Sequence, residues 1–135
     1  MTTIRDAQDQ LADLHPLLRS AVEEFESDYG TDIPIVGFGT LGSTMMGKRH
    51  ELDDDVKQRF FAKAEELLAN GDDETQTAVA TGLLEAVANA AERAGIPRSR
   101  LYEWLGPESQ AFVTAWDEFD ETTIGTSPGD QERSP

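Results

Sequence analysis

The stretch EELLANGDDETQTAV, residues 65–79, decides the fold of this chain. It joins two helical patterns across Gly71 and the acids at positions 72–74. Glycine commonly ends a helix, and an aspartate that follows it can accept a hydrogen bond from a free backbone N–H of the next helix. Asp72 or Asp73 therefore suits the N-cap position, and the stretch predicts an antiparallel helical hairpin.

Regular apolar spacing extends the hairpin in both directions. Apolar residues three or four apart predict one helix over about residues 52–70, and a stripe of small residues predicts a second over about 78–94. The hairpin resembles one HEAT-type repeat, but the ~40-residue period of such an array does not recur along the chain. We therefore expect a single hairpin within one domain.

Further helical patterns flank the hairpin. An apolar stripe covers about residues 4–25 and is interrupted by Pro16, so we expect either a break near His15 or two helices with Pro16 at the first position of the second. On the other side, a short segment at residues 99–105 precedes a last helix at about 107–121. The sequence thus predicts an all-α fold, a compact bundle of about five helices.

The two ends of the chain differ in composition. Residues 1–121 carry the helical patterns, and we expect them to form a single helical domain. Residues 122–135 have almost no apolar content, so we expect them to be a disordered tail.

The stretch TDIPIVGFGTLGSTMMG, residues 31–47, contains four glycines and an internal proline among apolar residues. Glycine and proline interrupt helices and strands alike, so we expect an irregular, packed connector. A short strand at residues 33–36 and a short helix at about 40–46 are the alternatives. In such a connector the glycines serve close packing, and Met45 and Met46 fill irregular core space.

Two phosphate-binding patterns overlap in this connector. Gly37, Gly39 and Gly42 satisfy the dinucleotide fingerprint GxGxxG, and residues 42–49 resemble a P-loop in which arginine replaces the magnesium-binding Ser or Thr. Both motifs work where a strand of a parallel sheet meets a helix, and no further strands are predicted. Nucleotide or small-molecule binding by the Gly37–Lys48 loop therefore stays only as an alternative function.

The composition excludes several kinds of chemistry. The chain has no cysteine, which excludes disulfides, thiolate metal sites and a cysteine nucleophile. His15 and His50 are far apart and belong to no metal-binding run, and the acidic clusters lack the spacing of a calcium loop. We therefore predict no enzyme activity, no metal and no cofactor.

The sequence shows no pattern for export or membrane insertion. Its first residues are polar, and no apolar run approaches the ~20 residues that span a bilayer. We therefore expect a cytoplasmic protein that does not bind membranes.

Acidity is the most pronounced property of the sequence. The 27 acidic residues outnumber the 11 basic ones and give a formal net charge of −16. Such a field repels nucleic acid and attracts positively charged macromolecules, so we expect a protein partner with a basic surface and no nucleic acid. Excess charge also keeps proteins soluble, and this simpler explanation stays open.

Candidate partner contacts combine acids with aromatic residues. The stretch from residue 101 to residue 132 contains aromatics but no lysine or arginine, which is typical of a face that attracts and anchors a basic protein. Trp116 and Phe119 have the helical spacing of core residues, whereas Tyr102 and Trp104 lie in the short segment before the last helix. The predicted contact residues are Asp72, Asp73, Glu74, Tyr102, Trp104, Asp117, Glu118 and Asp120.

Three stretches of the chain resemble small bacterial helical domains. They are HPLLRSAVEEFESDYGTDIPIVGFGTLGSTMM (15–46), EELLANGDDETQTAVATGLLEAV (65–87) and LYEWLGPESQAFVTAWDEFD (101–120). Some of these domains resemble immunity proteins of polymorphic or contact-dependent toxin systems.

The resemblance implies an immunity, or antitoxin-like, protein that neutralises a cognate toxin by stoichiometric binding. An acidic helical protein can block a basic nuclease by covering its phosphate-binding surface. No individual contact residue follows from the resemblance. Two alternatives remain open: a helical adaptor that binds an unknown partner in a groove, and the nucleotide or small-molecule binder described above.

Overall fold

The computed structural model describes residues 3–30 and 33–125, with side chains as far as residue 119. Every element in these ranges is helical, which confirms the all-α prediction. If the uninterrupted helix 73–93 is counted once, the described residues form seven helices, more than the number expected. The elements are α1 (Ile4–Ala12), α2 (Pro16–Tyr29), α3 (Pro34–Gly47), α4 (Asp54–Asn70), α5 (Asp73–Thr77), η1 (Ala78–Leu84), α6 (Glu85–Arg93), α7 (Arg98–Tyr102) and α8 (Pro107–Gly125).

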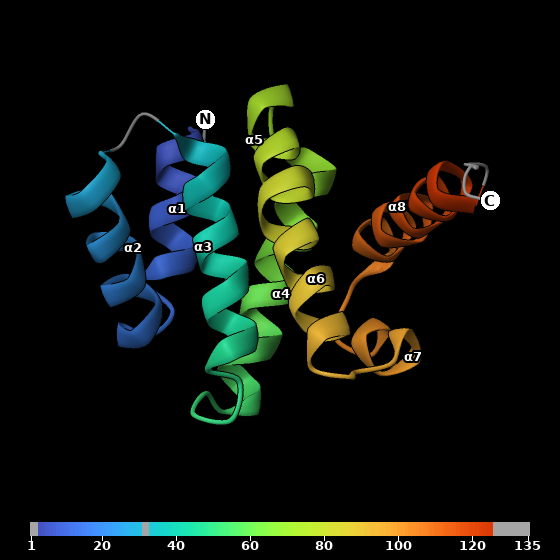
Figure 1. The fold of residues 1–135 in the computed structure, drawn as a ribbon. Helices are drawn as coiled ribbons and strands as arrows, with labels where there is room; N and C mark the ends of the chain where they lie inside the picture. Colours follow the sequence, from blue (N-terminus) through green and yellow to red (C-terminus); the bar gives the residue numbers. More distant parts are fainter. Residues whose placement is uncertain (1–2, 31–32, 126–135) are drawn as a thin grey trace.

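Helix α3 lies at the centre of the bundle (Figure 1). It packs against α1 and α2 on one side and against η1 and α6 on the other. Helix α4 contacts α1, α5, η1 and α8, so it connects the two ends of the bundle. Phe38 of α3, Phe60 of α4 and Leu83 of η1 are fully buried in the core that these helices share.

The hairpin expected from the sequence is present. Helix α4 ends at Asn70, and the next helix begins at Asp73 and runs in the opposite direction (Figure 1). Asp72 is its N-cap, because the carboxylate accepts a hydrogen bond from the Thr75 N–H at 2.8 Å. The resemblance of this hairpin to a HEAT-type repeat remains a prediction.

Both prolines that were expected to begin helices do so. Pro16 is at the start of α2, and the Nδ1 atom of His15 accepts a hydrogen bond from the Leu17 N–H at 3.1 Å. Pro107 is the first residue of α8. The sequence therefore places these helix starts correctly, since proline at the first turn sacrifices no intrahelical hydrogen bond.

Helix α8 extends beyond the predicted end of the domain. It continues to Gly125, past the end expected for the last helix at about residue 121, and the domain boundary itself stays a prediction. The rest of the predicted tail, residues 126–135, lies outside the described residues.

The glycine-rich stretch is the main correction to the sequence analysis. Residues 34–47 form one continuous helix, not an irregular connector, a short strand or a shorter helix from residue 40. Glycine is less favourable than alanine in a helix by ~1 kcal/mol per residue. Burial against neighbours on two sides outweighs this cost, since Phe38, Leu41 and Met45 are fully buried.

The glycines of this region allow close contact between α3 and η1. A Cβ atom at Gly42 would lie 2.5 Å from the carbonyl oxygen of Leu83, and a Cβ atom at Gly82 would collide with the carbonyl oxygen of Ile35. Only glycine permits such a close approach of two backbones. The GxGxxG pattern therefore serves helix packing, and the described part of the chain contains no strand that could precede a phosphate-binding loop.

The segment η1 is π-helical. Its seven residues lie between the α-helical segments α5 and α6 without a break in the helix. In a π-helix each N–H bonds to the carbonyl five residues earlier instead of four, so the turn is wider and holds more residues. Such segments are rare, and they occur often at functional sites.

Candidate protein-binding face

A ridge on the 73–93 helix separates two grooves. Asp73, Thr77 and Thr81 follow one another at four-residue spacing, all three are exposed, and we call them the threonine ridge. The Thr81 hydroxyl donates a hydrogen bond to the Thr77 carbonyl oxygen at 2.7 Å, which holds this side chain against its own helix. Asp73 and Thr77 line both grooves, so the ridge and the grooves form one continuous face.

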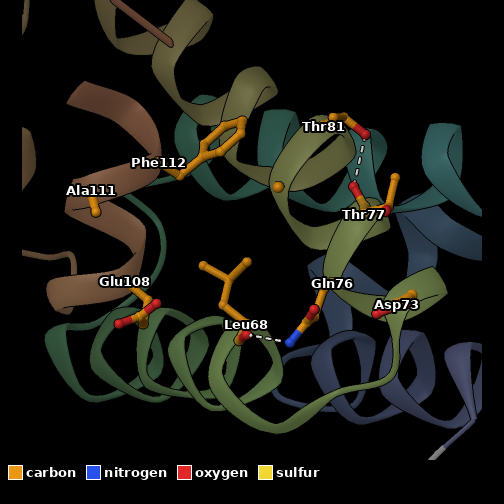
Figure 2. A pocket seen from close by; sticks show the side chains of 9 residues that line it. Leu68, Asp73, Gln76, Thr77, Thr81, Glu108, Ala111 and Phe112 are labelled. Carbon is orange, nitrogen blue, oxygen red and sulfur yellow. Dashed lines mark hydrogen bonds between the residues drawn. The ribbon is translucent and has the colours of Figure 1, made fainter. Parts of the chain in front are cut away.

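The first groove, which we call the α8 groove, lies between the threonine ridge and α8 (Figure 2). Its volume is about 570 Å³. Leu68 of α4 and Phe112 of α8 supply its apolar surface, and Asp73 and Glu108 lie on opposite sides of it. The Gln76 side chain is fixed there, because its Nε2 atom donates a hydrogen bond to the Leu68 carbonyl oxygen at 2.8 Å. The groove is thus apolar in the middle and acidic at its edges.

The second groove, which we call the α3 groove, lies on the other side of the threonine ridge, at the start of α3. It has a volume of about 410 Å³ and is lined by Ile4, Ile33, Pro34, Ile35, Asp73, Glu74 and Thr77. A neighbouring hollow of about 530 Å³ shares Ile35 with it and reaches along α3 and α6 to Glu85. The ridge is therefore flanked by open surface on both sides, and this surface is more apolar on the side of α3 than on the side of α8.

Exposed apolar side chains gather at the α3 groove and the neighbouring hollow. Ile33, Ile35 and Val36 are 43, 43 and 47% exposed, and they are three of the five exposed large hydrophobic residues in the described ranges. Single exposed apolar residues are ordinary, whereas a group of them on one patch marks an interaction surface. The α3 groove is therefore suited to contact with another protein.

The electrostatic potential of this face is negative. The carboxylates of Asp73, Glu74 and Glu108 form no salt bridge with any described residue. No lysine or arginine is among the residues that line the two grooves. At the far end of the neighbouring hollow, burial raises the pKa of Glu85. A partner that is basic would find no competing cation on this face.

The predicted contact residues at the hairpin fall on or beside this face. Asp73 and Glu74 belong to it. Asp72 is exposed next to them, but its carboxylate is occupied as the N-cap of α5, and the hydrogen bond from the Thr75 backbone lowers its pKa. Asp72 therefore has a structural role that the sequence analysis had also foreseen.

Two of the predicted residues in the C-terminal part instead hold α7 against α8. The hydroxyl groups of Tyr102 and Thr114 lie 2.6 Å apart in a hydrogen bond. The Arg98 guanidinium donates to both carboxylate oxygens of Asp117, at 2.8 and 3.0 Å. Tyr102 and Asp117 are half-buried, so their contacts stabilise the fold.

The remaining predicted residues lie apart from the ridge. Trp104 stacks on Phe61 of α4 with ring centroids 6.0 Å apart, and the Nζ atom of Lys57 lies 6.0 Å from the Trp104 ring centroid. Glu118 is exposed on α8 and lines neither groove. The side chain of Asp120 lies outside the described residues. The structure thus brings only Asp73 and Glu74 of the predicted set into one face.

One of the two aromatic residues expected in the core is not there. Trp116 is half-buried and packs against the core, whereas Phe119 is 70% exposed. Helical spacing identifies the side of a helix that faces its neighbours, but it does not show how far those neighbours extend. Helix α8 contacts α4 and η1, and at Phe119 it has passed the end of the surface that could cover it.

Most residues that form the two grooves were not predicted from the sequence. Thr77 and Thr81 lie within a helix and give no periodic signal, and Glu108 and Ala111 are exposed on the polar side of α8. Only the packing of α8 beside the 73–93 helix brings these residues together. Ile33, Ile35 and Val36 were noticed, but as a possible strand.

Two further observations concern the described residues as a whole. No group of three or more His, Asp or Glu side chains in these ranges is placed to hold a metal ion. No helix in the same ranges is both long enough and apolar enough to cross a membrane.

Residues 9–122 match the model of a protein family described as a domain of unknown function (DUF7674). Comparison with curated proteins and with solved structures found no match. Because the family model covers most of the chain, this protein belongs to the DUF7674 family.

Proposed function

We propose that this protein is an immunity, or antitoxin-like, protein that neutralises a cognate toxin with a basic surface by stoichiometric binding. The binding surface in this proposal is the face formed by the threonine ridge, the α8 groove and the α3 groove. One observation carries it: exposed Ile33, Ile35 and Val36 gather beside carboxylates that have no salt-bridge partner among the described residues.

The apolar part of the face would supply binding free energy. Burial of apolar area stabilises a complex by ~25 cal/mol per Å². Side chains as large as Ile35 and Val36, exposed by nearly half, would each contribute roughly 1 to 2 kcal/mol if a partner covered them. These side chains are therefore the expected anchors of the complex.

The acidic part of the face would select the partner. A net charge of −16 attracts a basic protein over a distance and speeds its association, and it repels acidic proteins and nucleic acid. Salt screens this attraction. The proposal therefore predicts an association rate that falls as the salt concentration rises.

The test is a titration of the full-length chain with the toxin domain encoded in the neighbouring reading frame. We expect a 1:1 complex, loss of toxicity, and an association rate that falls about tenfold between roughly 50 and 500 mM salt. A toxin that does not bind this chain, or that leaves cells alive without it, would refute the proposal.

Two matched variants locate the binding surface. Ile35→Ser removes an exposed apolar side chain in the first turn of α3, where serine is compatible with a helix start, and should weaken binding about tenfold. Phe119→Ser removes another exposed apolar side chain, one that lines neither groove, and should leave binding unchanged. Equal effects of both variants would place the binding surface elsewhere.

A helical adaptor is the second candidate function. The open, apolar α3 groove favours it, because such grooves accept the apolar face of a partner helix. An adaptor of this kind predicts the same effect of Ile35→Ser but an association rate that hardly changes with salt. The salt titration described above therefore separates the two functions.

A further inference from the structure

Resting on the proposed function, we infer that the α8 groove binds one arginine or lysine side chain of the protein partner. The aliphatic part of that side chain lies on Leu68 and Phe112, and its charged end reaches an acidic edge of the groove, at Asp73 or at Glu108.

The surface of the groove matches the two parts of a long basic side chain. Arginine and lysine carry an aliphatic stem that prefers apolar surroundings and a charged end that prefers carboxylates or water. Leu68 and Phe112 form the apolar middle of the groove, and Asp73 and Glu108 lie on its two sides (Figure 2). A purely apolar side chain would leave these carboxylates without a partner.

The helix starts beside the groove disfavour an anion as its occupant. Free N–H groups at a helix N-terminus bind anions, but both helices that begin here are already capped by carboxylates. Asp72 accepts a hydrogen bond from Thr75, and Glu65 accepts hydrogen bonds from the N–H groups of Glu108 and Ser109 at 2.8 and 3.0 Å. The N–H groups of Thr75, Glu108 and Ser109 are therefore used, and each cap adds a negative charge near the groove.

The carboxylates at the edges of the groove are free to accept a cation. Neither Asp73 nor Glu108 forms a salt bridge within the described ranges. None of the residues that line the groove is basic. A basic side chain of a partner therefore has no competitor from the described part of this chain.

The experiment uses peptides and the full-length, ¹⁵N-labelled chain. Acetyl-Leu-Ala-Arg-Ala-Leu-amide is titrated to millimolar concentration, and amide chemical shifts report where it binds. The same peptide with citrulline in place of arginine keeps the size and removes the charge. We expect the arginine peptide to shift amides of the threonine ridge and of residues 108–112, and the citrulline peptide to bind about tenfold more weakly.

Variants separate the groove from the general acidity of the surface. Ala111 is exposed and lines the groove, so Ala111→Trp fills it without a change in charge and should abolish these shifts. Ala94→Trp makes the same substitution at an exposed site outside the groove and should preserve them. Glu108→Gln and Asp73→Asn should each weaken the arginine peptide about threefold.

Each outcome decides the inference. Shifts that spread over the acidic surface, or that persist in both Ala111→Trp and Glu108→Gln, overturn it. If the toxin binds the chain but the arginine peptide does not bind in the groove, this inference fails and the proposed function stands. Binding of the arginine peptide in the groove without any toxin binding supports the chemistry of the groove and refutes the immunity role.

Discussion

The carboxylate of Glu65 on α4 holds the beginning of α8 in place. It accepts hydrogen bonds from the N–H of Glu108 at 2.8 Å and from the N–H and the hydroxyl of Ser109, both at 3.0 Å. Gly106 makes room for it, because a Cβ atom there would lie 2.5 Å from the Glu65 side chain. This contact joins residues more than forty positions apart, and it is the basis of our main prediction.

Glu65→Ala should reduce the free energy of unfolding by about 3 kcal/mol. Glu108 is exposed, so its N–H can bond to water instead. Ser109 is only 1% exposed, and both its backbone N–H and its hydroxyl lose their acceptor. Buried donors left without a partner cost ~1 to 3 kcal/mol each. At roughly 4 °C per kcal/mol for a chain of this size, the melting temperature should fall by about 12 °C.

Urea unfolding followed by circular dichroism measures this change, and hydrogen exchange shows where it acts. Exchange should become faster at the amides of α8 before the amides of α3. Glu65→Gln keeps one acceptor oxygen and should lose about half as much stability. Glu66→Ala, which removes only an exposed pair with Lys63, should cost less than ~0.5 kcal/mol and serves as the control. A Glu65→Ala protein within ~0.5 kcal/mol of the wild type would show that this cap does not hold α8.

Three further predictions concern packing and charge. Gly42→Ala should destabilise the protein by about 2 kcal/mol or more in urea unfolding, because the new Cβ meets the backbone of η1. Gly47→Ala has open space at its Cβ and should stabilise the protein by up to ~1 kcal/mol. The reverse order of stabilities would refute the close α3–η1 contact. Burial raises the pKa of Glu85, so the folded protein binds the carboxyl proton of Glu85 more tightly than the unfolded chain does. The resulting contribution to the free energy of unfolding is present at low pH and is lost as the pH rises through the folded pKa. Glu85→Gln should therefore raise the melting temperature near neutral pH and have no effect below about pH 4, and a gain that is equal at both pH values would contradict this cause. A double-mutant cycle of Arg98→Ala and Asp117→Ala should give a coupling of about 1 kcal/mol, and a coupling near zero would mean that this pair does not stabilise the α7–α8 contact.

The sequence predicts the fold wherever the signal is local. Asp72 at the N-cap and Pro16 at the start of α2 are in the expected positions, because capping and the missing N–H of proline act within one turn. Helix α3 was not predicted, since its stability comes from neighbours that are remote in sequence. The same glycines that weaken the local helical signal, Gly42 above all, are required by the backbone of η1.

The candidate face was predicted only in part, for a related reason. Charge indicates that acidic residues attract a basic partner, and this reasoning selected Asp73 and Glu74, which lie on the face. Charge also selected Asp117, and the search for aromatic anchors selected Tyr102, but both side chains form contacts inside the protein. Composition cannot distinguish a free carboxylate from one already paired, and it cannot show that α8 lies next to the threonine ridge.

The π-helical segment has a consequence for how the 73–93 helix is oriented at its two ends. Relative to an unbroken α-helix, the wider turn absorbs roughly one additional residue, which rotates everything after it by about 100°. Asp73 can therefore line the α8 groove while the small residues that follow η1 pack against α3. Shortening residues 78–84 by a single amino acid would remove this offset. The helix could then pack correctly against α8 or against α3, but not against both.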